Sequence, residues 1–480
     1  MADRSNSTNK PNIVFIIARG ESVRNFLYSA AIRSLHENAR ITLLSVITDE
    51  QFRTRFEHEV DQIIELREYP EHRLVNYLRA LLHDAHYRWL WTEKVKNKQV
   101  ILDDRARTLG GKIKRSLWKT ISYFFANQGS LSFLSTLDRK LSILLKPTAD
   151  FDRLFSQLKP DLVFNGSHIH ASRGDLPIRI AHQMGIPTAT FIFSWDNLSS
   201  RARLLPHYDH YLVWHKGMKE QLLNIYPSIK EDHVYITGTP QFDFHFRKEY
   251  ILPRRELCSR IGLDPGRPFI LYTTGMARDF PGEYLHVRSI IALLHEMDET
   301  KRPQLVVRAY IKGNSPEMEE LAEQNIPGVV FPPILWEEKW FTPMEEDLCI
   351  YTSLLHYCEL GINPASTVSL ELMMMDKPVI NIGFDPPGYQ VAKGYHWSRH
   401  IQFDHYRDLV RSGAVKIAYS TDDMRRMIHD SLQNPLELQL ERRSFLAETF
   451  ANTLDGRSAQ RISEILQKII TGKDNSSYRN

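Results

Sequence analysis

The segment with the most informative chemistry is residues 359–371, ELGINPASTVSLE, which is typical of a strand, a tight turn of small residues and a helix start. Ser366 and Thr367 offer hydroxyls beside the free N–H groups of a helix N-terminus, which attract anions such as phosphates. Glu371 follows Thr367 by four residues, so its carboxylate lies on the same helix face and can accept hydrogen bonds from a ribose diol. We therefore predict a nucleotide-diphosphate site containing Asn363, Ser366, Thr367 and Glu371. The alternative is an ordinary N-capped helix, because Ser and Thr favour that position in any protein.

Further donors and cations follow two other segments that are typical of strands. Thr274 and Gly275 come directly after the apolar residues 269–273, and Arg308 and Lys312 stand at the end of the next such segment. Because the carboxyl ends of parallel strands meet at one sheet edge, we expect these hydroxyls and cations to converge. Together they would neutralise a diphosphate, so we predict no metal in the site. Each group taken alone is equally compatible with a surface loop.

Length and composition indicate a soluble globular protein. A chain of 480 residues is too long for one compact core, which favours two domains. The hydrophobic share of 42% and the charged share of 25% are ordinary for this class. Three cysteines without a C-x-x-C pair predict neither a disulfide framework nor a zinc site. The N-terminal residues resemble neither a secretory signal nor a membrane span, so we expect a cytoplasmic protein.

The apolar segments alternate with helix-length segments in both halves of the chain. Strands are expected in the first half at residues 12–18, 41–47, 161–164, 188–193, 210–214 and 233–236, and in the second half at 269–273, 304–309, 328–331, 358–362, 378–382 and 414–418. This alternation predicts an α/β fold with two Rossmann-like domains facing each other across a cleft. The expected divisions are an N-terminal domain at 1–245 with a helical insertion at about 50–150, a linker at 246–267, a nucleotide-binding domain at 268–435 and closing helices at 436–474.

The C-terminal half resembles the donor domain of glycosyltransferases of the B fold, especially the branch shared with CDP-glycerol glycerophosphotransferases and UDP-N-acetylglucosamine 2-epimerases. In that branch a strand, a turn and a helix with small residues, Ser or Thr and a following Glu hold the nucleotide sugar, which matches residues 363–371. Residues 235–243, YITGTPQFD, are similar to the turn by which these enzymes leave the first domain, and residues 455–462, DGRSAQRI, to their closing helix. The resemblance does not cover the expected insertion.

This resemblance implies a glycosyltransferase that moves a sugar from a nucleotide-diphosphate donor to an acceptor hydroxyl, in bacterial surface polysaccharide or glycolipid synthesis. The nucleotide sugar would be a co-substrate, and no cofactor is expected. The acceptor would be a sugar, a lipid-linked molecule or a glycan. Two alternatives on the same fold are a CDP-polyol phosphotransferase and a nucleotide-sugar 2-epimerase. A third is a non-catalytic nucleotide-binding subunit.

An inverting transfer also needs a base that deprotonates the acceptor hydroxyl, and in this fold the base would come from the first domain. Residues 165–170, NGSHIH, and 194–198, SWDNL, each follow an expected strand at its carboxyl end. We predict His170 or Asp196 as the base, since a neutral histidine suits cytoplasmic pH. SWDNL resembles a motif of bacterial sugar and polyol-phosphate transferases, although the resemblance assigns its Asp no role. Turn-forming hydrogen bonds are the alternative for Asp196, and a packed or solvent-facing ring is the alternative for His170.

A basic and aromatic stretch runs from Arg88 to Lys119. It contains ten Lys or Arg against three acids, with Trp89, Trp91 and Trp118 interleaved. The net charge of the whole chain, +3, is too small to argue for nucleic acid, and we expect none as a partner. The stretch is suited to peripheral contact with an anionic membrane, here the inner membrane face, which would fit a lipid-linked acceptor. The alternative is a helical insertion with buried Trp side chains and solvated cations.

Overall fold

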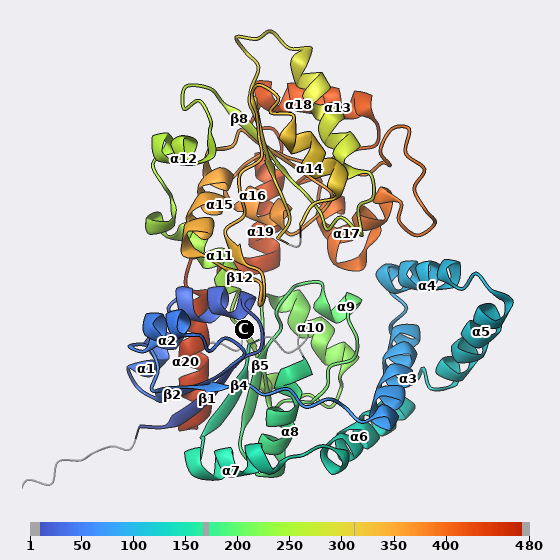
Figure 1. The fold of residues 1–480 in the computed structure, drawn as a ribbon, viewed down its shortest axis with the longest axis vertical. Helices are drawn as coiled ribbons and strands as arrows, with labels where there is room; N and C mark the ends of the chain where they lie inside the picture. Colours follow the sequence, from blue (N-terminus) through green and yellow to red (C-terminus); the bar gives the residue numbers. More distant parts are fainter. Residues whose placement is uncertain (1–9, 167–171, 312, 473–480) are drawn as a thin grey trace, which may run out of the picture.

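Two parallel β-sheets organise the chain, one in each half (Figure 1). The computed structural model describes residues 10–166, 172–311 and 313–472. The strand order is β3-β2-β1-β4-β5-β6-β7 in the first sheet and β10-β9-β8-β13-β14-β15 in the second. Strand order reverses between β1 and β4 in one sheet and between β8 and β13 in the other. In doubly wound sheets, ligands bind at this switch point, outside the carboxyl ends of the strands.

The first domain is centred on β1, an uninterrupted apolar strand in which Ile13 to Ile17 are fully buried. A parallel strand needs such a sequence because helices cover both faces of its sheet. The strands are β1 (Asn12–Ile17), β2 (Arg40–Ser45), β3 (Gln62–Glu65), β4 (Leu162–Asn165), β5 (Thr188–Phe191), β6 (His210–Val213) and β7 (Val234–Ile236). The helices around them are the π-helix η1 (Val23–Tyr28), α1 (Ala31–His36), α2 (Glu50–Phe56), α7 (Ala149–Leu158), α8 (Asp175–Gln183), α9 (Asn197–Ser200), α10 (Lys216–Ile225) and α11 (Pro240–Asp243).

The second domain repeats this arrangement with six strands. They are β8 (Phe269–Thr273), β9 (Gln304–Arg308), β10 (Val329–Val330), β13 (Leu360–Asn363), β14 (Val379–Ile382) and β15 (Lys416–Ala418). Its helices are α13 (Glu283–His295), α14 (Pro316–Glu323), α15 (Glu345–Tyr357), α16 (Val368–Met374), α17 (Asp404–Arg411), α18 (Thr421–Gln433) and α19 (Gln439–Phe450). The two Rossmann-like domains expected from the sequence are therefore confirmed.

The structure corrects the expected start of the insertion. Residues 50–65, assigned to the helical insertion, form α2 and the strand β3, which pairs in parallel with β2 and extends the first sheet. The four-residue strand QIIE is short and only half-buried, so it has no clear apolar pattern. The expected linker at 246–267 likewise contains a regular helix, α12 (Arg254–Ile261).

The helical insertion consists of α3 (Arg73–Leu90), α4 (Glu93–Arg105), α5 (Leu109–Phe124) and α6 (Gln128–Leu145), which form an arm beside the first domain (Figure 1). A buried ion cluster fixes the base of this arm. The carboxylate of Asp138, on α6, accepts hydrogen bonds from Arg79 on α3 at 2.9 Å and from Arg179 on α8 at 2.6 Å. Since Asp138 and Arg179 are almost completely buried, their charges require this pairing.

The arm also reaches the second domain through α4. The backbone N–H of Glu93 donates to the carboxylate of Asp404 at 2.7 Å, and the side-chain amide of Asn97 donates to the carbonyl of Gly394 at 2.8 Å. These contacts connect the insertion to α17 and to the loop before it. The insertion therefore bridges the two domains on one side of the cleft.

A short hairpin makes a second bridge. Strands β11 (Trp336–Glu337) and β12 (Thr342–Pro343) extend from the second domain to the loop after β1. The N–H of Gly20 donates to the carbonyl of Trp340 at 2.8 Å. A Cβ atom at Gly20 would lie 2.2 Å from the Thr342 hydroxyl oxygen and 2.6 Å from its backbone, so only glycine permits this approach.

The last helix, α20 (Ser458–Thr471), returns to the first domain and packs against α1 and α11. Its apolar face, which includes Ile462, Ile465 and Leu466, is fully buried. The Ser463 hydroxyl donates to the carbonyl of Ala31 at 2.8 Å, and the carboxylate of Asp243 accepts from the first N–H groups of the helix. The first domain is thus completed by the end of the chain.

Candidate functional site

A cavity of about 260 Å³ lies between the domains, where the switch points of the two sheets face each other. The first domain lines it with residues of the loop after β1, of η1, of the loop after β5 and of α11. The second domain contributes the carboxyl ends of β8 and β9 and parts of the hairpin, α15 and α16. The lining residues are Glu21, Arg24, Phe193, Ser194, Gln241, Thr273, Thr274, Arg308, Ala309, Tyr310, Ile311, Trp336, Asp347, Leu348, Tyr351, Thr367, Val368 and Glu371.

The cation of the first domain that lines this cavity is Arg24, on the π-helix η1. Its guanidinium donates to two neutral oxygens, those of the Asn25 and Gln241 side chains, both at 3.0 Å. Burial lowers the pKa of Arg24 below its ordinary value, and the negative charges of Glu371 and Glu21 oppose that shift. In the described part of the chain, no carboxylate forms an ion pair with Arg24. Its positive charge is therefore directed at the cavity without direct neutralisation.

Arg308, in contrast, is neutralised within the second domain. Both oxygens of the Asp347 carboxylate lie 2.6 Å from its guanidinium, and the Pro333 carbonyl accepts a third hydrogen bond at 3.0 Å. The indole N–H of Trp336 also donates to Asp347 at 2.8 Å. Arg308 lines the cavity as predicted, but most of its charge is used in this buried pair.

Glu371 faces the cavity from α16 and is oriented by two partners. The Tyr351 hydroxyl donates to one carboxylate oxygen at 2.6 Å, and Nε2 of His245 lies 3.2 Å from the other. Burial, together with the Glu371 charge, raises the pKa of Tyr351 well above its usual value. The hydroxyl therefore keeps its proton at neutral pH and donates it to Glu371. The carboxylate is thereby held in one orientation with acceptor capacity left for a ligand hydroxyl.

The hydroxyls at the end of β8 are placed to donate into the cavity. The Thr274 hydroxyl oxygen accepts the N–H of Tyr310 at 2.8 Å, which leaves its own O–H proton for another acceptor. The hydroxyl oxygen of the neighbouring Thr273 is buried and has no hydrogen-bond partner among the described residues. A buried hydroxyl without a partner costs about 1–3 kcal/mol, which a bound polar ligand would recover.

The turn beneath these threonines is fixed by an ionisable group. The N–H of Gly275 and the Tyr272 hydroxyl both donate to the carboxylate of Glu283, at 2.9 and 3.0 Å. Burial raises the pKa of Glu283 to about 8, so the carboxyl group is largely protonated at neutral pH. Gly275 itself packs against Phe280, where a Cβ atom would lie 2.0 Å from the ring. The predicted site residue Gly275 therefore shapes the wall of the cavity.

The turn from β13 to α16 is held together by the fully buried side chain of Asn363. Its amide oxygen accepts the N–H of Ser366 at 2.9 Å and the hydroxyl of Ser369 at 3.2 Å. Ala365 takes a left-handed conformation, with φ +57°. Thr367 lines the cavity and accepts the indole N–H of Trp195 at 3.2 Å, a contact between the domains. Of the predicted residues in this segment, Thr367 and Glu371 line the cavity, while Asn363 and Ser366 set the turn that presents them.

Asp196 stands behind the cavity wall rather than in it. The hydroxyls of Ser194 and Ser200 donate to its carboxylate at 2.7 and 2.8 Å, and the Lys94 ammonium lies at 3.5 Å. Burial opposes its charge, but Lys94 and neighbouring cations outweigh that effect and keep the pKa of Asp196 well below its usual range. A carboxylate with so low a pKa is a weak proton acceptor at neutral pH. The other predicted base, His170, and the predicted donor-binding Lys312 lie outside the described residues.

No group of three or more His, Cys, Asp or Glu side chains with metal-binding geometry occurs in residues 10–166, 172–311 and 313–472. Along the same ranges, no helix combines the length and apolar character that a membrane span requires.

Neither a protein-family model nor a curated protein matches this sequence. Solved structures do match it. A UDP-N-acetylglucosamine 2-epimerase aligns with a TM-score of 0.55 and 12% identity over 98% of each chain. The UDP-GlcNAc 2-epimerase of Neisseria meningitidis bound to UDP-GlcNAc gives 0.53 and 13%, over 95% of this chain and 100% of the other. A glycosyltransferase of Rickettsia africae gives 0.50 and 12%, over 97% and 100%. The chain has the glycosyltransferase B fold.

Within this B fold, several cavity residues were not predicted from the sequence. Arg24 lies in a π-helix, which has no simple periodic signature in the sequence. Tyr351 lies on an α15 face that becomes part of the site only because α15 packs beside α16. Both residues depend on tertiary placement, which local sequence patterns do not encode.

Proposed function

We propose that this protein is a glycosyltransferase that moves a sugar from a nucleotide-diphosphate donor to an acceptor hydroxyl. One observation carries the proposal. The cavity presents a guanidinium that has no ion-pair partner among the described residues, Arg24 of the first domain, and an oriented carboxylate, Glu371 of the second. A guanidinium recognises phosphate oxygens, and a carboxylate accepts hydrogen bonds from a ribose diol. The Thr273 hydroxyl, which has no hydrogen-bond partner in the described part of the chain, adds a further donor.

In this reaction, the acceptor oxygen bonds to the anomeric carbon of the sugar while the bond from that carbon to the diphosphate breaks. Negative charge develops on the leaving diphosphate, where Arg24 and the Thr274 hydroxyl would stabilise it. A base in the first domain takes the acceptor proton. His170 is the proposed base, because the depressed pKa of Asp196 makes that carboxylate a weaker candidate. We propose that neither a metal nor a cofactor takes part.

A nucleotide-sugar 2-epimerase is the second candidate, because solved structures with this fold carry that name. Such an enzyme would process the same donor without an acceptor. A CDP-polyol phosphotransferase would use the same cavity and attack phosphorus instead of carbon. Product analysis separates them: incubation of the nucleotide sugar with protein alone yields a sugar with inverted configuration at C2 only in the epimerase case. A subunit without catalytic function would bind the nucleotide and form no product.

The acceptor belongs to the proposal as well. We propose a sugar, lipid-linked or glycan acceptor in bacterial surface polysaccharide or glycolipid synthesis, with the protein in the cytoplasm at the inner membrane face. A second pocket, lined by Leu90 of the insertion, Trp195 of the first domain and Asp404 of the second, lies on the side of the cleft that the insertion borders.

The first experiment is a thermal-shift screen with UDP, GDP, CDP, dTDP, CMP and their common sugar or polyol conjugates. We expect one nucleotide family to raise the melting temperature. If no nucleotide stabilises the protein, the proposed nucleotide site is wrong. For the nucleotide that does bind, the 2′-deoxy form and the Glu371→Ala variant test the ribose contact.

Removal of the Glu371 carboxylate should weaken binding of the ribonucleotide by about 10- to 150-fold, the equivalent of a charged hydrogen bond, and affect the deoxynucleotide less. Glu320→Ala, at an exposed position of the same domain, is the matched control. Equal losses for both nucleotides would remove Glu371 from the ribose subsite.

A further inference from the structure

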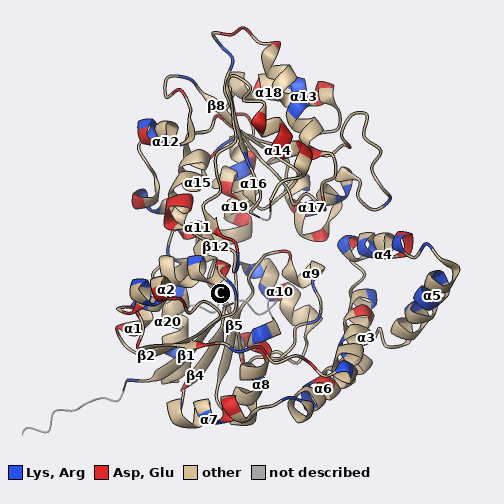
Figure 2. Ribbon diagram, in the orientation of Figure 1, with Lys and Arg blue, Asp and Glu red and all other residues tan. Residues whose placement is uncertain are grey.

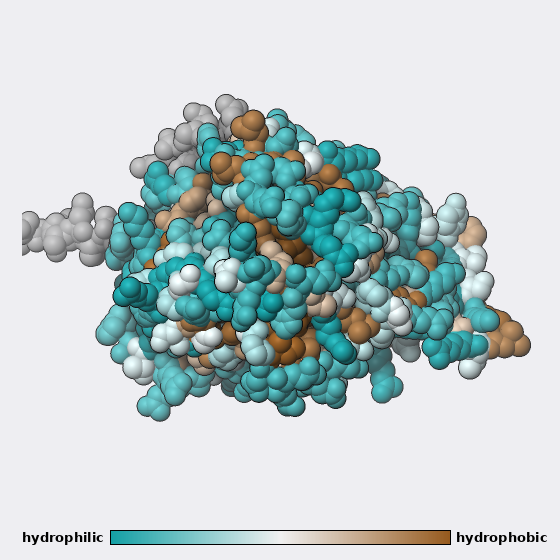
Figure 3. Space-filling model, turned by 90° about the horizontal axis from the view of Figure 1, so that it is seen from above, coloured by the Kyte–Doolittle hydropathy of each residue, from teal (hydrophilic) through white to brown (hydrophobic). Residues whose placement is uncertain are grey.

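Helix α5 of the insertion exposes an apolar face to solvent. Leu109, Ile113 and Leu117 follow one another at four-residue spacing, so they share one side of the helix, and Phe124 continues that side. Between 60% and 76% of each of these side chains is exposed. In Figure 3, hydrophobic side chains gather at the right-hand edge of the molecule, where α5 lies in Figure 1. Four large apolar side chains exposed on one side of a helix are typical of an interaction surface.

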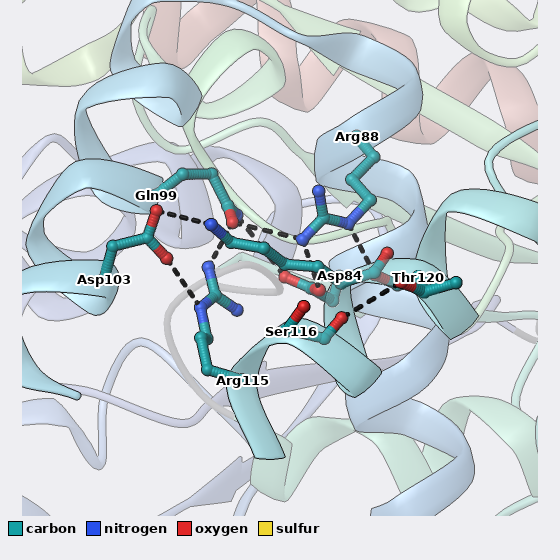
Figure 4. Close-up of polar contacts among 9 residues, drawn as sticks. Asp84, Arg88, Gln99, Asp103, Arg115, Ser116 and Thr120 are labelled. Atoms are coloured by element: carbon teal, nitrogen blue, oxygen red, sulfur yellow. Dashed lines mark hydrogen bonds and ion pairs between the residues drawn. The ribbon is translucent and has the colours of Figure 1, made fainter. Parts of the chain in front are cut away.

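The opposite side of α5 is held by polar contacts with α3 and α4 (Figure 4). The Arg115 guanidinium donates to the Asp103 carboxylate at 3.1 Å and also to the side chain of Gln99. Arg88 donates to the hydroxyl of Ser122 at 2.5 Å. These contacts fix which side of the helix points outward. The exposed apolar residues are therefore a set feature of the fold.

The charged side chains of α5 are also divided between its inner and outer sides. Residues 105–124 contain six Lys or Arg and no acid (Figure 2 shows the blue segments on α4 and α5). Of these, Arg115 and Lys119 form ion pairs with Asp103. Lys112 and Lys114 are exposed, border the apolar face on either side, and have no ion-pair partner among the described residues. An apolar stripe bordered by uncompensated cations is complementary to a surface of anionic lipid headgroups.

The structure also changes which residues are candidates for a membrane contact, compared with the Trp-containing stretch expected from the sequence. Trp89 packs against the cores of the first domain and of the insertion, Trp118 is half-buried, and Trp91, directly after α3, is 46% exposed. Arg88 is held inside the insertion. The contact surface is consequently not the Trp-containing stretch as a whole but the outer side of α5.

We propose that α5 binds the surface of an anionic lipid bilayer, with Leu109, Ile113, Leu117 and Phe124 entering the headgroup region and Lys112 and Lys114 contacting lipid phosphates. The insertion joins both domains, so this contact would hold the cleft at a fixed position relative to the bilayer. This inference does not rest on the nucleotide site, and it can hold whichever reaction the cavity supports.

Flotation of the full-length protein with vesicles of phosphatidylcholine alone and with 30% phosphatidylglycerol tests the proposal. We expect binding to the anionic vesicles, with loss of binding at high salt because lipid–lysine attraction is screened. Lys112→Gln with Lys114→Gln should weaken partitioning by about 30-fold, from about a fivefold effect for each charge. The matched control is Lys159→Gln with Lys230→Gln, which removes two exposed lysines elsewhere.

A second variant, Leu109→Ser with Ile113→Ser and Leu117→Ser, should reduce binding to the level of neutral vesicles without lowering the melting temperature. Its control is Leu436→Ser with Leu440→Ser, two exposed leucines of the second domain. Unchanged flotation of the α5 variants, or no binding of wild type to anionic vesicles, overturns the proposal. If sedimentation shows that the serine variant turns a dimer into a monomer and wild type does not float, the face is an interface between two copies of this chain.

Discussion

Replacement of Arg24 by alanine should weaken binding of a nucleoside diphosphate much more than binding of the corresponding nucleoside. Among the described residues, the half-buried guanidinium donates only to neutral oxygens, so a phosphate would be its first anionic partner. A charge-assisted hydrogen bond contributes about 1.5–3 kcal/mol. The dissociation constant of UDP, or of the diphosphate selected by the nucleotide screen, should therefore rise by about 10- to 150-fold.

Isothermal titration of wild type, Arg24→Ala and Arg24→Lys with the diphosphate and with its nucleoside measures this difference. The nucleoside lacks the phosphates, so its affinity should change little. Lysine should restore part of the lost affinity because it keeps the charge but not the planar fork. Arg278→Ala, at a mostly exposed position of the second domain, controls for loss of overall positive charge. Equal losses for nucleoside and diphosphate, or no loss at all, would refute a phosphate contact at Arg24.

Two further predictions concern the walls of the cavity. Glu283 has a pKa of about 8 in the folded protein, against an ordinary 4.5, so the folded state favours the protonated carboxyl group. The stabilisation is complete below pH 4.5, and the free energy of unfolding falls by about 1.4 kcal/mol per pH unit as the pH rises toward 8. The Glu283→Gln variant has no titrating group at this position. The free energy of unfolding of the variant minus that of wild type, measured in urea, should therefore increase by about 3 kcal/mol between pH 5 and pH 7.5. A difference that stays constant over this range would contradict the raised pKa of Glu283. Gly20→Ala should destabilise the protein by about 1–3 kcal/mol and weaken nucleotide binding, because the added Cβ displaces the hairpin from the loop that contains Glu21 and leads into η1 with Arg24. Thr342→Gly should not rescue it, since backbone atoms also collide, and an unchanged melting temperature of Gly20→Ala would show that the bridge is dispensable.

The sequence predicted most of the fold because parallel strands buried on both faces are long apolar segments. β1 is such a strand, and the sequence positions of the central strands of both sheets followed from the same pattern. β3 was not predicted, because an edge strand is only half-buried and its apolar and polar residues alternate weakly. The B fold itself followed from the resemblance of residues 363–371, 235–243 and 455–462 to known enzymes.

The site was predictable only in part. Thr274, Arg308, Thr367 and Glu371 follow strands or start a helix, and sequence spacing was enough to bring them to the cavity. Spacing did not reveal that Asp347, from a different helix, neutralises Arg308, or that Arg24 supplies the uncompensated cation. Charge pairing is a property of the tertiary structure, so a list of cations in sequence overestimates the positive charge that a ligand meets.

The return of α20 to the first domain affects the order in which the protein can assemble during synthesis. When the first 250 residues have left the ribosome, α1 and α11 still lack the apolar surface of Ile462, Ile465 and Leu466. The second domain, whose sheet is built from consecutive strands between β8 and β15, can fold before α20 has left the ribosome. The first domain reaches its final state only after the last helix emerges, so the half of the protein that is made first is the half that is finished last.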